Sequence, residues 1–103
     1  MLMNKSYQAG EIVCFKMVNG DEIVAKIVDA HLTGWVVSRP CTVIPSPQGL
    51  GLMQSLFSAD INTNITLSKA HVIMHSPVVD KLEAHYIQTT TGIQPVSKGS
   101  IIT

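Results

Sequence analysis

Two histidines four positions apart, His71 and His75, form the spacing in this sequence that comes nearest to a metal site. On a helix, such a pair lies on one face and can chelate zinc. These two residues instead flank the apolar segment 72–74, which predicts a strand. A strand separates them by about 13 Å, at about 3.3 Å per residue, so they cannot share one ion. We therefore expect no metal site and no cofactor.

Motifs for covalent or acid-base catalysis are absent from the sequence. Residues 49–51 are only a fragment of a dinucleotide fingerprint, and neither a Walker-type loop nor a Gly-x-Ser-x-Gly elbow occurs. Asp29 and Asp60 have no evident partner for acid and base catalysis. Cys14 and Cys41 lie 27 positions apart within apolar runs, so we expect buried free thiols. The protein is therefore expected not to be an enzyme.

Several polar and aromatic residues in or beside predicted turns are candidates for a nucleic-acid site. His31 and His71 could stack on unpaired bases, and Lys69 could neutralise a phosphate. Trp35 follows the turn between the second and third predicted strands and could also stack a base. An anchor in the core or in an interface is the favoured interpretation of Trp35, because tryptophan so often packs in this way.

The chain that must position these side chains favours strands. Eleven Ile, eleven Val and eight Thr give 30 β-branched residues, whereas Ala and Leu together number 13. Segments 12–18 and 23–28 predict two strands around Asn19-Gly20. This dipeptide indicates a hairpin, because Asn and Gly tolerate positive φ.

The register of this hairpin can be predicted from its apolar faces. Apolar residues alternate on one side of each strand, namely Val13, Phe15 and Met17 on the first and Ile23, Ala25 and Ile27 on the second. An odd turn, such as three residues with Gly20 left-handed, puts both sets on the same face, whereas an even turn would bury charge. We therefore expect an odd turn, with Lys16 and Lys26 on a wetter face.

The remaining segments predict further strands and one helix. Strands are expected at 34–44, 50–57, 65–67 and 72–74, with loops at 45–49 and 58–64 and a tight turn at 68–71. Pro40 cannot donate to a ladder and implies a bulge or an edge. Ser76 as the cap and Pro77 at the first position predict a helix over about 77–89. Its apolar face comprises Val79, Leu82 and Tyr86. Residues 93–103 are expected to form a mobile tail.

Length and charge narrow the class of protein. The 103 residues suit one domain, and seven basic residues balance seven acidic ones, which excludes a strongly basic nucleic-acid surface. Charged residues make up only 14% of the chain, against about 25% in a typical protein. We therefore expect self-association to hide apolar surface.

No apolar run has secretory or membrane-spanning length, so a cytoplasmic protein without membrane contact is expected.

The order of these elements resembles the five-stranded small barrel of the Sm/LSm family, in particular its divergent phage-type members. Val13 to Gly20 (VCFKMVNG), followed by Ala25-Lys26-Ile27, is similar to the first Sm motif. Leu67 to Val72 (LSKAHV) is similar to the second, with an apolar residue on each side of the tight turn. Ala25 stands where the family prefers Gly, and Ser68-Lys69 replaces its Arg-Gly. The resemblance covers residues 10–75.

The resemblance implies a mostly β fold, a small, strongly bent antiparallel barrel of five strands, SH3-like in form, with one C-terminal helix in a single domain of residues 1–92. It also implies a homo-oligomeric ring in which the fourth strand of one subunit pairs with the fifth of the next. Such a ring would bind single-stranded RNA, or DNA, near its pore without catalysis. The residues at or near the family's binding positions are Asp29, His31, Trp35, Lys69 and His71.

Two other interpretations stay open. The absence of a basic patch favours an architectural or protein-interaction ring that docks a partner through its apolar face and C-terminal helix. A monomeric SH3-like or OB-type barrel fits the strand count but explains the apolar surface less well. Salt separates the first two interpretations, because phosphate binding weakens steeply as salt rises and apolar docking does not.

Overall fold

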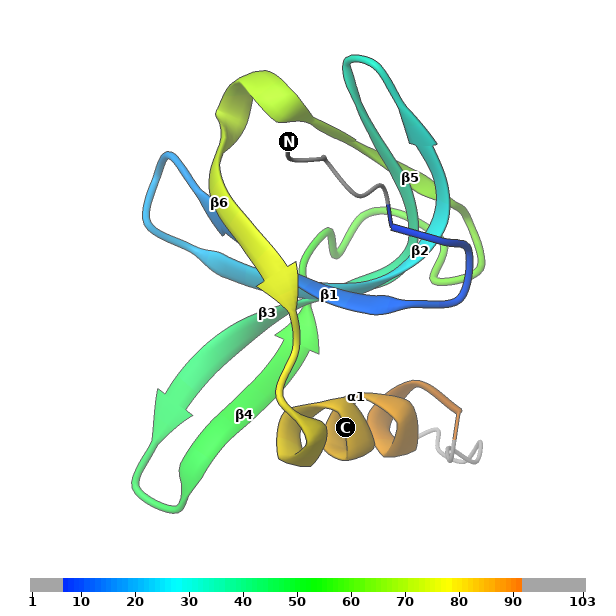
Figure 1. Ribbon diagram of the computed structural model, residues 1–103. Coiled ribbons are helices and arrows are strands. Elements are labelled where there is room, and N and C mark those ends of the chain that lie inside the picture. Colours follow the sequence, from blue (N-terminus) through cyan, green and yellow to red (C-terminus); the bar gives the residue numbers. More distant parts are fainter. Residues whose placement is uncertain (1–6, 92–103) are drawn as a thin grey trace.

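Six strands, one short 3-10 helix and one α-helix form the part of the chain that the computed structural model describes, residues 7–91 (Figure 1). In chain order they are β1 (Ile12–Met17), β2 (Glu22–His31), β3 (Gly34–Ser46), β4 (Gly49–Gln54), β5 (Ile65–Ser68), η1 (Lys69–His71), β6 (Val72–Pro77) and α1 (Asp80–Thr91). The mostly β class with one C-terminal helix is confirmed. The predicted tail, residues 93–103, lies outside the described residues.

The β1–β2 hairpin has the register predicted from its apolar faces. Val13 pairs with Ala25 and Phe15 with Ile23, so the two apolar rows lie on one side of the sheet. Burial sets this register, because a slip of one residue would move both rows to the other face.

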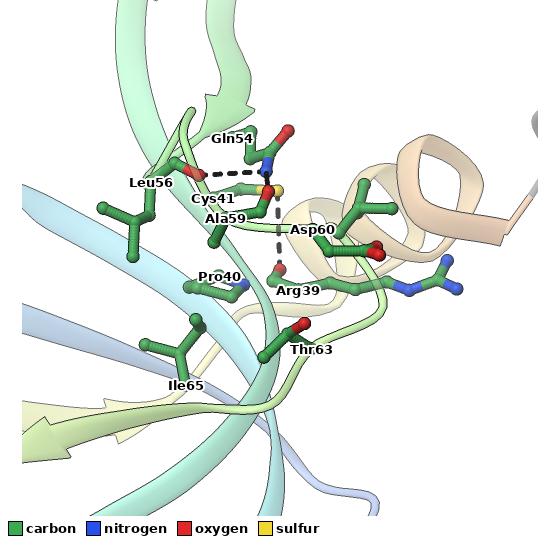
Figure 2. Close-up of a pocket in the computed structure, with 10 residues that line it drawn as sticks. Arg39, Pro40, Cys41, Gln54, Leu56, Ala59, Asp60, Thr63 and Ile65 are labelled. Atoms are coloured by element: carbon green, nitrogen blue, oxygen red, sulfur yellow. Dashed lines mark hydrogen bonds between the residues drawn. The ribbon is translucent and has the colours of Figure 1, made fainter.

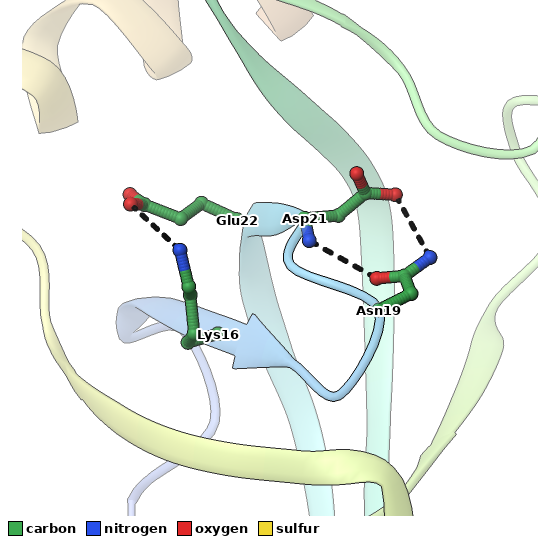
Figure 3. Close-up of polar contacts among 4 residues, drawn as sticks. All are labelled: Lys16, Asn19, Asp21 and Glu22. Atoms are coloured by element: carbon green, nitrogen blue, oxygen red, sulfur yellow. Dashed lines mark hydrogen bonds and ion pairs between the residues drawn. The ribbon is translucent and has the colours of Figure 1, made fainter.

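The turn of this hairpin has the predicted odd length. Met17 N–H donates to the Asp21 carbonyl at 2.8 Å, which leaves three residues, 18–20, in the turn. Gly20 has a φ of 99°, a conformation that a side chain would strain. Asn19 Oδ1 accepts from the Asp21 N–H at 3.0 Å and orders the turn (Figure 3).

A bulge at Arg39 and Pro40 divides β3 into two halves. Val24 pairs with Cys41 and Lys26 with Ser38, so Arg39 and Pro40 together face one residue of β2. The first half of β3 pairs with β5 and the second half with β4. The bulge predicted at Pro40 is confirmed, and the hairpin of β3 and β4 extends from it away from the rest of the sheet (Figure 1).

The six strands form one antiparallel sheet in the order β4-β3-β2-β1-β6, with β5 also paired to β3. Strands β5 and β6 follow each other across η1, but no ladder joins them within residues 7–91. The sheet is strongly bent and is not closed by hydrogen bonds. The finer prediction of a five-stranded barrel therefore stays a prediction.

The concave side of the bent sheet holds the first hydrophobic core. It contains the two apolar rows of the β1–β2 hairpin together with residues of β3 and β5, namely Val13, Phe15, Ala25, Ile27, Trp35, Val37 and Leu67. Burial of such side chains contributes about 25 cal/mol for each Å² of apolar surface removed from water. This core joins β1, β2, β3 and β5 on one side of the sheet.

The opposite face holds a second core, which corrects the expectation that this face is wet. Val24 and Cys41 are buried there against Tyr86 of α1. Lys26 is exposed and Lys16 is half-buried, so only part of the predicted wet face reaches water. The Tyr86 hydroxyl donates to the carbonyl of Ser38 and to that of Arg39, each at 2.9 Å, and so anchors the helix at the bulge.

Helix α1 begins three residues later than the sequence predicts. Ser76 and Pro77 are the last residues of β6, where Ser76 pairs with Cys14, so the predicted cap and first helical position are wrong. Strand pairing with β1 outweighs the local helix signal there. Val78, not Val79, is then buried under the helix, and Val79 is 69% exposed.

No helix in the described part of the chain has the length and apolar character needed to cross a membrane.

Candidate nucleic-acid interface

Helix η1 bridges the two turns at either end of β2. The Lys69 N–H donates to the Thr33 carbonyl in the β2–β3 turn, and the Val18 N–H in the β1–β2 turn donates to the His71 carbonyl, both at 2.9 Å. Ser68 caps η1, because its hydroxyl accepts from the Ala70 N–H at 3.2 Å. We call residues 18–21, 29–33 and 68–71 together the η1 end.

Close packing at the η1 end depends on a glycine. A Cβ atom added to Gly34 would collide with the carbonyl oxygen of Leu67 on the neighbouring strand β5. Gly34 pairs with both His31 and Ser68, so its missing side chain lets β2, β3 and β5 meet at this end. Through Gly34, His31 at the end of β2 lies in register with Ser68, the residue before η1.

Trp35 supports this end rather than offering a free stacking surface. It is 5% exposed, and its ring lies 5.0 Å from that of Phe15 and 5.0 Å from that of His75. The Lys69 ammonium lies 5.3 Å from the Trp35 ring centroid, within the range of a cation–π contact. The buried Trp35 ring is thus not open to stacking by a base, and it contacts the Lys69 ammonium.

Asp29 and His31 form a second polar pair at the η1 end. Oδ2 of Asp29 lies 3.6 Å from Nε2 of His31, and both side chains are more than half exposed. Leu32, directly beyond them in the turn, is 90% exposed. Leu32 was not predicted from the sequence. Its position in the two-residue turn between β2 and β3 is the one signal that could have identified it.

The two histidines with the metal-like spacing lie in different surroundings. His71 is exposed in η1, whereas His75 in β6 lies against Trp35, with Nδ1 at 2.7 Å from the Tyr7 hydroxyl. Among residues 7–91, no three His, Cys, Asp or Glu side chains lie close enough to hold a metal ion. His75 and Tyr7 thus form part of the aromatic packing that supports Trp35.

Both cysteines are free, as expected. Cys41 is buried, and burial raises the pKa of its thiol to about 11. Cys14 is half-buried, and burial is again the main cause that raises its pKa. A thiol held protonated at neutral pH is a poor nucleophile.

A small apolar pocket lies next to the bulge, between β3 and the loop that joins β4 to β5 (Figure 2). It has a volume of about 20 Å³, which is room for about one water molecule. The Gln54 amide donates to the carbonyls of Leu56 and Ala59, at 3.0 and 3.2 Å, and so orders the loop that forms its wall. The Arg39 guanidinium donates to Asn62 Oδ1 at 3.0 Å and to the Thr90 carbonyl. We interpret this pocket as structural, because no substrate of ordinary size fits it.

A segment without charged residues is a surface feature that was not predicted, although it can be read directly from the sequence. Residues 40–59 contain no Asp, Glu, Lys, Arg or His, and we call them the uncharged segment. The segment includes the second half of β3, the edge strand β4 and part of the following loop. Leu50, Met53, Leu56 and Phe57 are exposed on it, with Phe57 at 72%.

The chain matches no protein-family model and no curated protein sequence. The structure brings Lys69 onto Trp35 and Asp29 beside His31, and it connects His71 to the same end through η1. It places the uncharged segment on an edge strand of the sheet.

Proposed function

We propose that the protein is a non-catalytic, Sm-like homo-oligomeric ring that binds single-stranded RNA, or DNA, through the η1 end. The observation that carries this proposal is the placement of Lys69, His71 and His31 around one short helix that bridges two turns. Lysine neutralises phosphates and imidazole rings stack on bases, and both interactions tolerate many sequences.

Sheet edges support the ring. Within residues 7–91, β4 and β5 each pair with β3 alone and β6 pairs with β1 alone, so each of these strands presents one row of backbone groups without a ladder partner in this part of the chain. β4 carries no charge or proline that would block another strand. Pairing of β4 with β6 of a neighbouring copy would satisfy both edges, and a rotation that closes would give a ring.

Repetition compensates for the weakness of a single site. One Lys and two His per protomer give little affinity to a chain whose net charge is zero with neutral histidines. A ring presents several copies at once, and linked sites gain about 100-fold or more in overall affinity from effective concentration. Assembly is therefore a condition for binding in this proposal.

Fluorescence anisotropy with labelled single-stranded oligonucleotides tests the proposal at low salt, where phosphate contacts are least screened. Wild-type protein should bind, and raised salt should weaken the complex. Lys69→Gln should weaken binding about tenfold, because each ring loses one phosphate contact in every protomer. Lys81→Gln, an exposed lysine of α1, is the matched control and should bind like wild type.

No binding by the wild-type protein at low salt would overturn the proposal. An equal loss in Lys69→Gln and Lys81→Gln would show that charge in general, and not the η1 end, attracts the oligonucleotide.

An architectural or protein-interaction ring is a second candidate, and the uncharged segment favours it. Phe57 and Leu56 are exposed beyond β4 on an ordered loop, where aromatic and aliphatic anchors suit a protein partner. An interaction through this surface would be insensitive to salt, in contrast to phosphate binding.

A further inference from the structure

A second and larger cleft lies where the bulge of β3 meets the end of α1. It has a volume of about 590 Å³, and its lining includes Lys26 of β2, Ser38 and Arg39 of β3, Ile61 of the loop between β4 and β5, and residues 89–91 of α1. We call it the bulge cleft. Binding sites for small molecules commonly have volumes of about 300–1,000 Å³, so the bulge cleft has room for an organic ligand.

The charged side chains that line the bulge cleft are both cationic. They are Lys26 and Arg39, and neither forms an ion pair within residues 7–91. The acid next to the cleft in sequence, Asp60, lines the small apolar pocket of Figure 2, where its carboxylate accepts from the Asn62 N–H at 2.9 Å. The positive charge of the bulge cleft is therefore not balanced by a carboxylate in this part of the chain.

The Arg39 guanidinium is held in place by neutral groups. It donates to Asn62 Oδ1 at 3.0 Å and to the Thr90 carbonyl, and its side chain extends from the bulge towards α1 (Figure 2). These two bonds use two of the five N–H donors of a guanidinium, which leaves three for a ligand. Because the side chain is already ordered, a ligand loses little affinity to fixing it.

The backbone at Arg39 adopts a costly conformation to place this side chain. Its φ of 50° is one that residues other than glycine rarely adopt. The Tyr86 hydroxyl holds this backbone through the carbonyls of Ser38 and Arg39. Bulges often redirect a side chain next to a binding site, and strained residues that their surroundings hold in place gather at such sites.

Hydroxyl groups lie beside the two cations. Lys26 and Ser38 are register partners across β2 and β3, and Thr89 contributes to the lining from α1. A phosphate monoester carries a charge of about −1.5 to −2 at pH 7 and has three acceptor oxygens. Its charge matches two cations, whereas a single carboxylate would balance only one of them.

We propose that the bulge cleft binds the phosphate group of a small organic phosphate of about the size of a nucleoside monophosphate, with Lys26 and Arg39 as the charged contacts. Ile61, which is 47% exposed, offers an apolar wall to the organic part of the ligand. This site goes beyond the proposed function, because it lies at the bulge and requires neither the η1 end nor a ring.

Isothermal titration calorimetry with adenosine monophosphate tests the proposal, at an ionic strength of about 0.15 M that screens non-specific attraction. Wild-type protein should bind the nucleotide saturably, with a Kd of about 1 mM or lower. Lys26→Gln alters an exposed side chain and should weaken binding about tenfold, because one charged contact is lost. Lys81→Gln, at the opposite end of α1, is the matched control and should bind like wild type.

Further titrations examine the phosphate and the second cation. Inorganic phosphate should compete with adenosine monophosphate, and adenosine, which lacks the phosphate, should bind at least about tenfold more weakly. Arg39→Lys keeps the charge but loses the planar fork, so it should also weaken binding. Circular dichroism verifies that each variant is folded.

The outcomes separate this site from the η1 end. Absence of saturable nucleotide binding, or equal affinity of Lys26→Gln and wild type, overturns the bulge cleft as a phosphate site. A loss of nucleotide binding in Lys69→Gln but not in Lys26→Gln would assign the nucleotide to the η1 end and overturn it as well. Nucleotide binding that depends on Lys26, in a protein that binds no oligonucleotide at low salt, would support the bulge cleft and overturn the proposed function alone.

Discussion

The uncharged segment and the η1 end are opposites in chemistry, although the first contains the second half of β3 and the other adjoins the start of β3 at Gly34. Residues 40–59 carry no charged or histidine side chain and contain β4, which has a single partner strand among the described residues. The η1 end gathers Asp29, His31, Lys69 and His71 around one helix of three residues. Our proposals assign a protein contact to the first region and the nucleic acid to the second.

In the proposed function, this difference gives assembly and ligand binding separate structural bases. The bulge at Arg39 and Pro40 is the boundary, because β3 changes its outer partner from β5 to β4 there. A substitution on one side should therefore alter mass without altering the site, and a substitution on the other should do the reverse.

The largest expected effect comes from placing charge on the β4 edge. Leu50→Glu combined with Met53→Glu changes two exposed side chains, so the protomer should fold normally. Charged residues on an edge strand oppose strand addition. We expect the assembly to dissociate to a species of 11.1 kDa, and RNA affinity to fall about 100-fold with the loss of avidity. Light scattering and anisotropy measure the two effects.

Leu32→Glu is the matched control for this experiment. Leu32 is 90% exposed at the η1 end, so the same kind of charge there should leave the mass unchanged while weakening RNA binding. If the β4 double variant retains the wild-type mass, β4 is not a contact between copies.

A smaller effect is expected at the bulge that separates the two regions. Arg39 has a φ of 50° and donates hydrogen bonds to Asn62 and Thr90. Arg39→Ala loses these bonds and keeps the strained backbone, which should lower the free energy of unfolding by about 1–2 kcal/mol. Arg39→Gly should cost about 1 kcal/mol less, because glycine adopts positive φ without strain. Urea denaturation gives both values, and a glycine variant less stable than the alanine variant would contradict the role of backbone strain.

The smallest expected effect is a loss of stability at alkaline pH caused by Cys41, a residue of the uncharged segment. Burial raises the pKa of Cys41 from 9.0 to about 11, so the folded state disfavours the thiolate. The stability that depends on the protonated thiol is present below the unfolded pKa and is lost as pH rises from 9.0 towards about 11. The melting temperature of wild type should therefore fall more over this range than that of Cys41→Val. Parallel curves for the two proteins would show that the Cys41 thiol does not titrate with unfolding.

The β1–β2 hairpin and the bulge could be predicted from the sequence because their causes are local. Alternation of apolar residues with Gly20 in the turn fixes the register, and Pro40 lacks the N–H that a regular ladder needs. Tryptophan side chains usually pack in a core or an interface, and the structure places Trp35 in the first core.

The second core and the helix start could not be predicted in this way, because they depend on contacts between distant segments. Val24 and Cys41 become buried only when Tyr86 of α1 packs on them. Ser76 joins β6 because it pairs with Cys14, 62 residues away, against its local preference for a helix cap. The positions of Lys69 and His71 between two strands could be predicted from the sequence, because Ser68-Lys69-Ala70-His71 separates two apolar segments. The role of these residues in a binding site stays a prediction.

Size-exclusion chromatography with light scattering tests the central claim, a ring of identical subunits, most directly. The account predicts one species whose mass is an integer multiple of 11.1 kDa, with several protomers. A clean monomer of 11.1 kDa would contradict it, because neither the pairing of β4 with β6 nor the avidity of the η1 end could then operate.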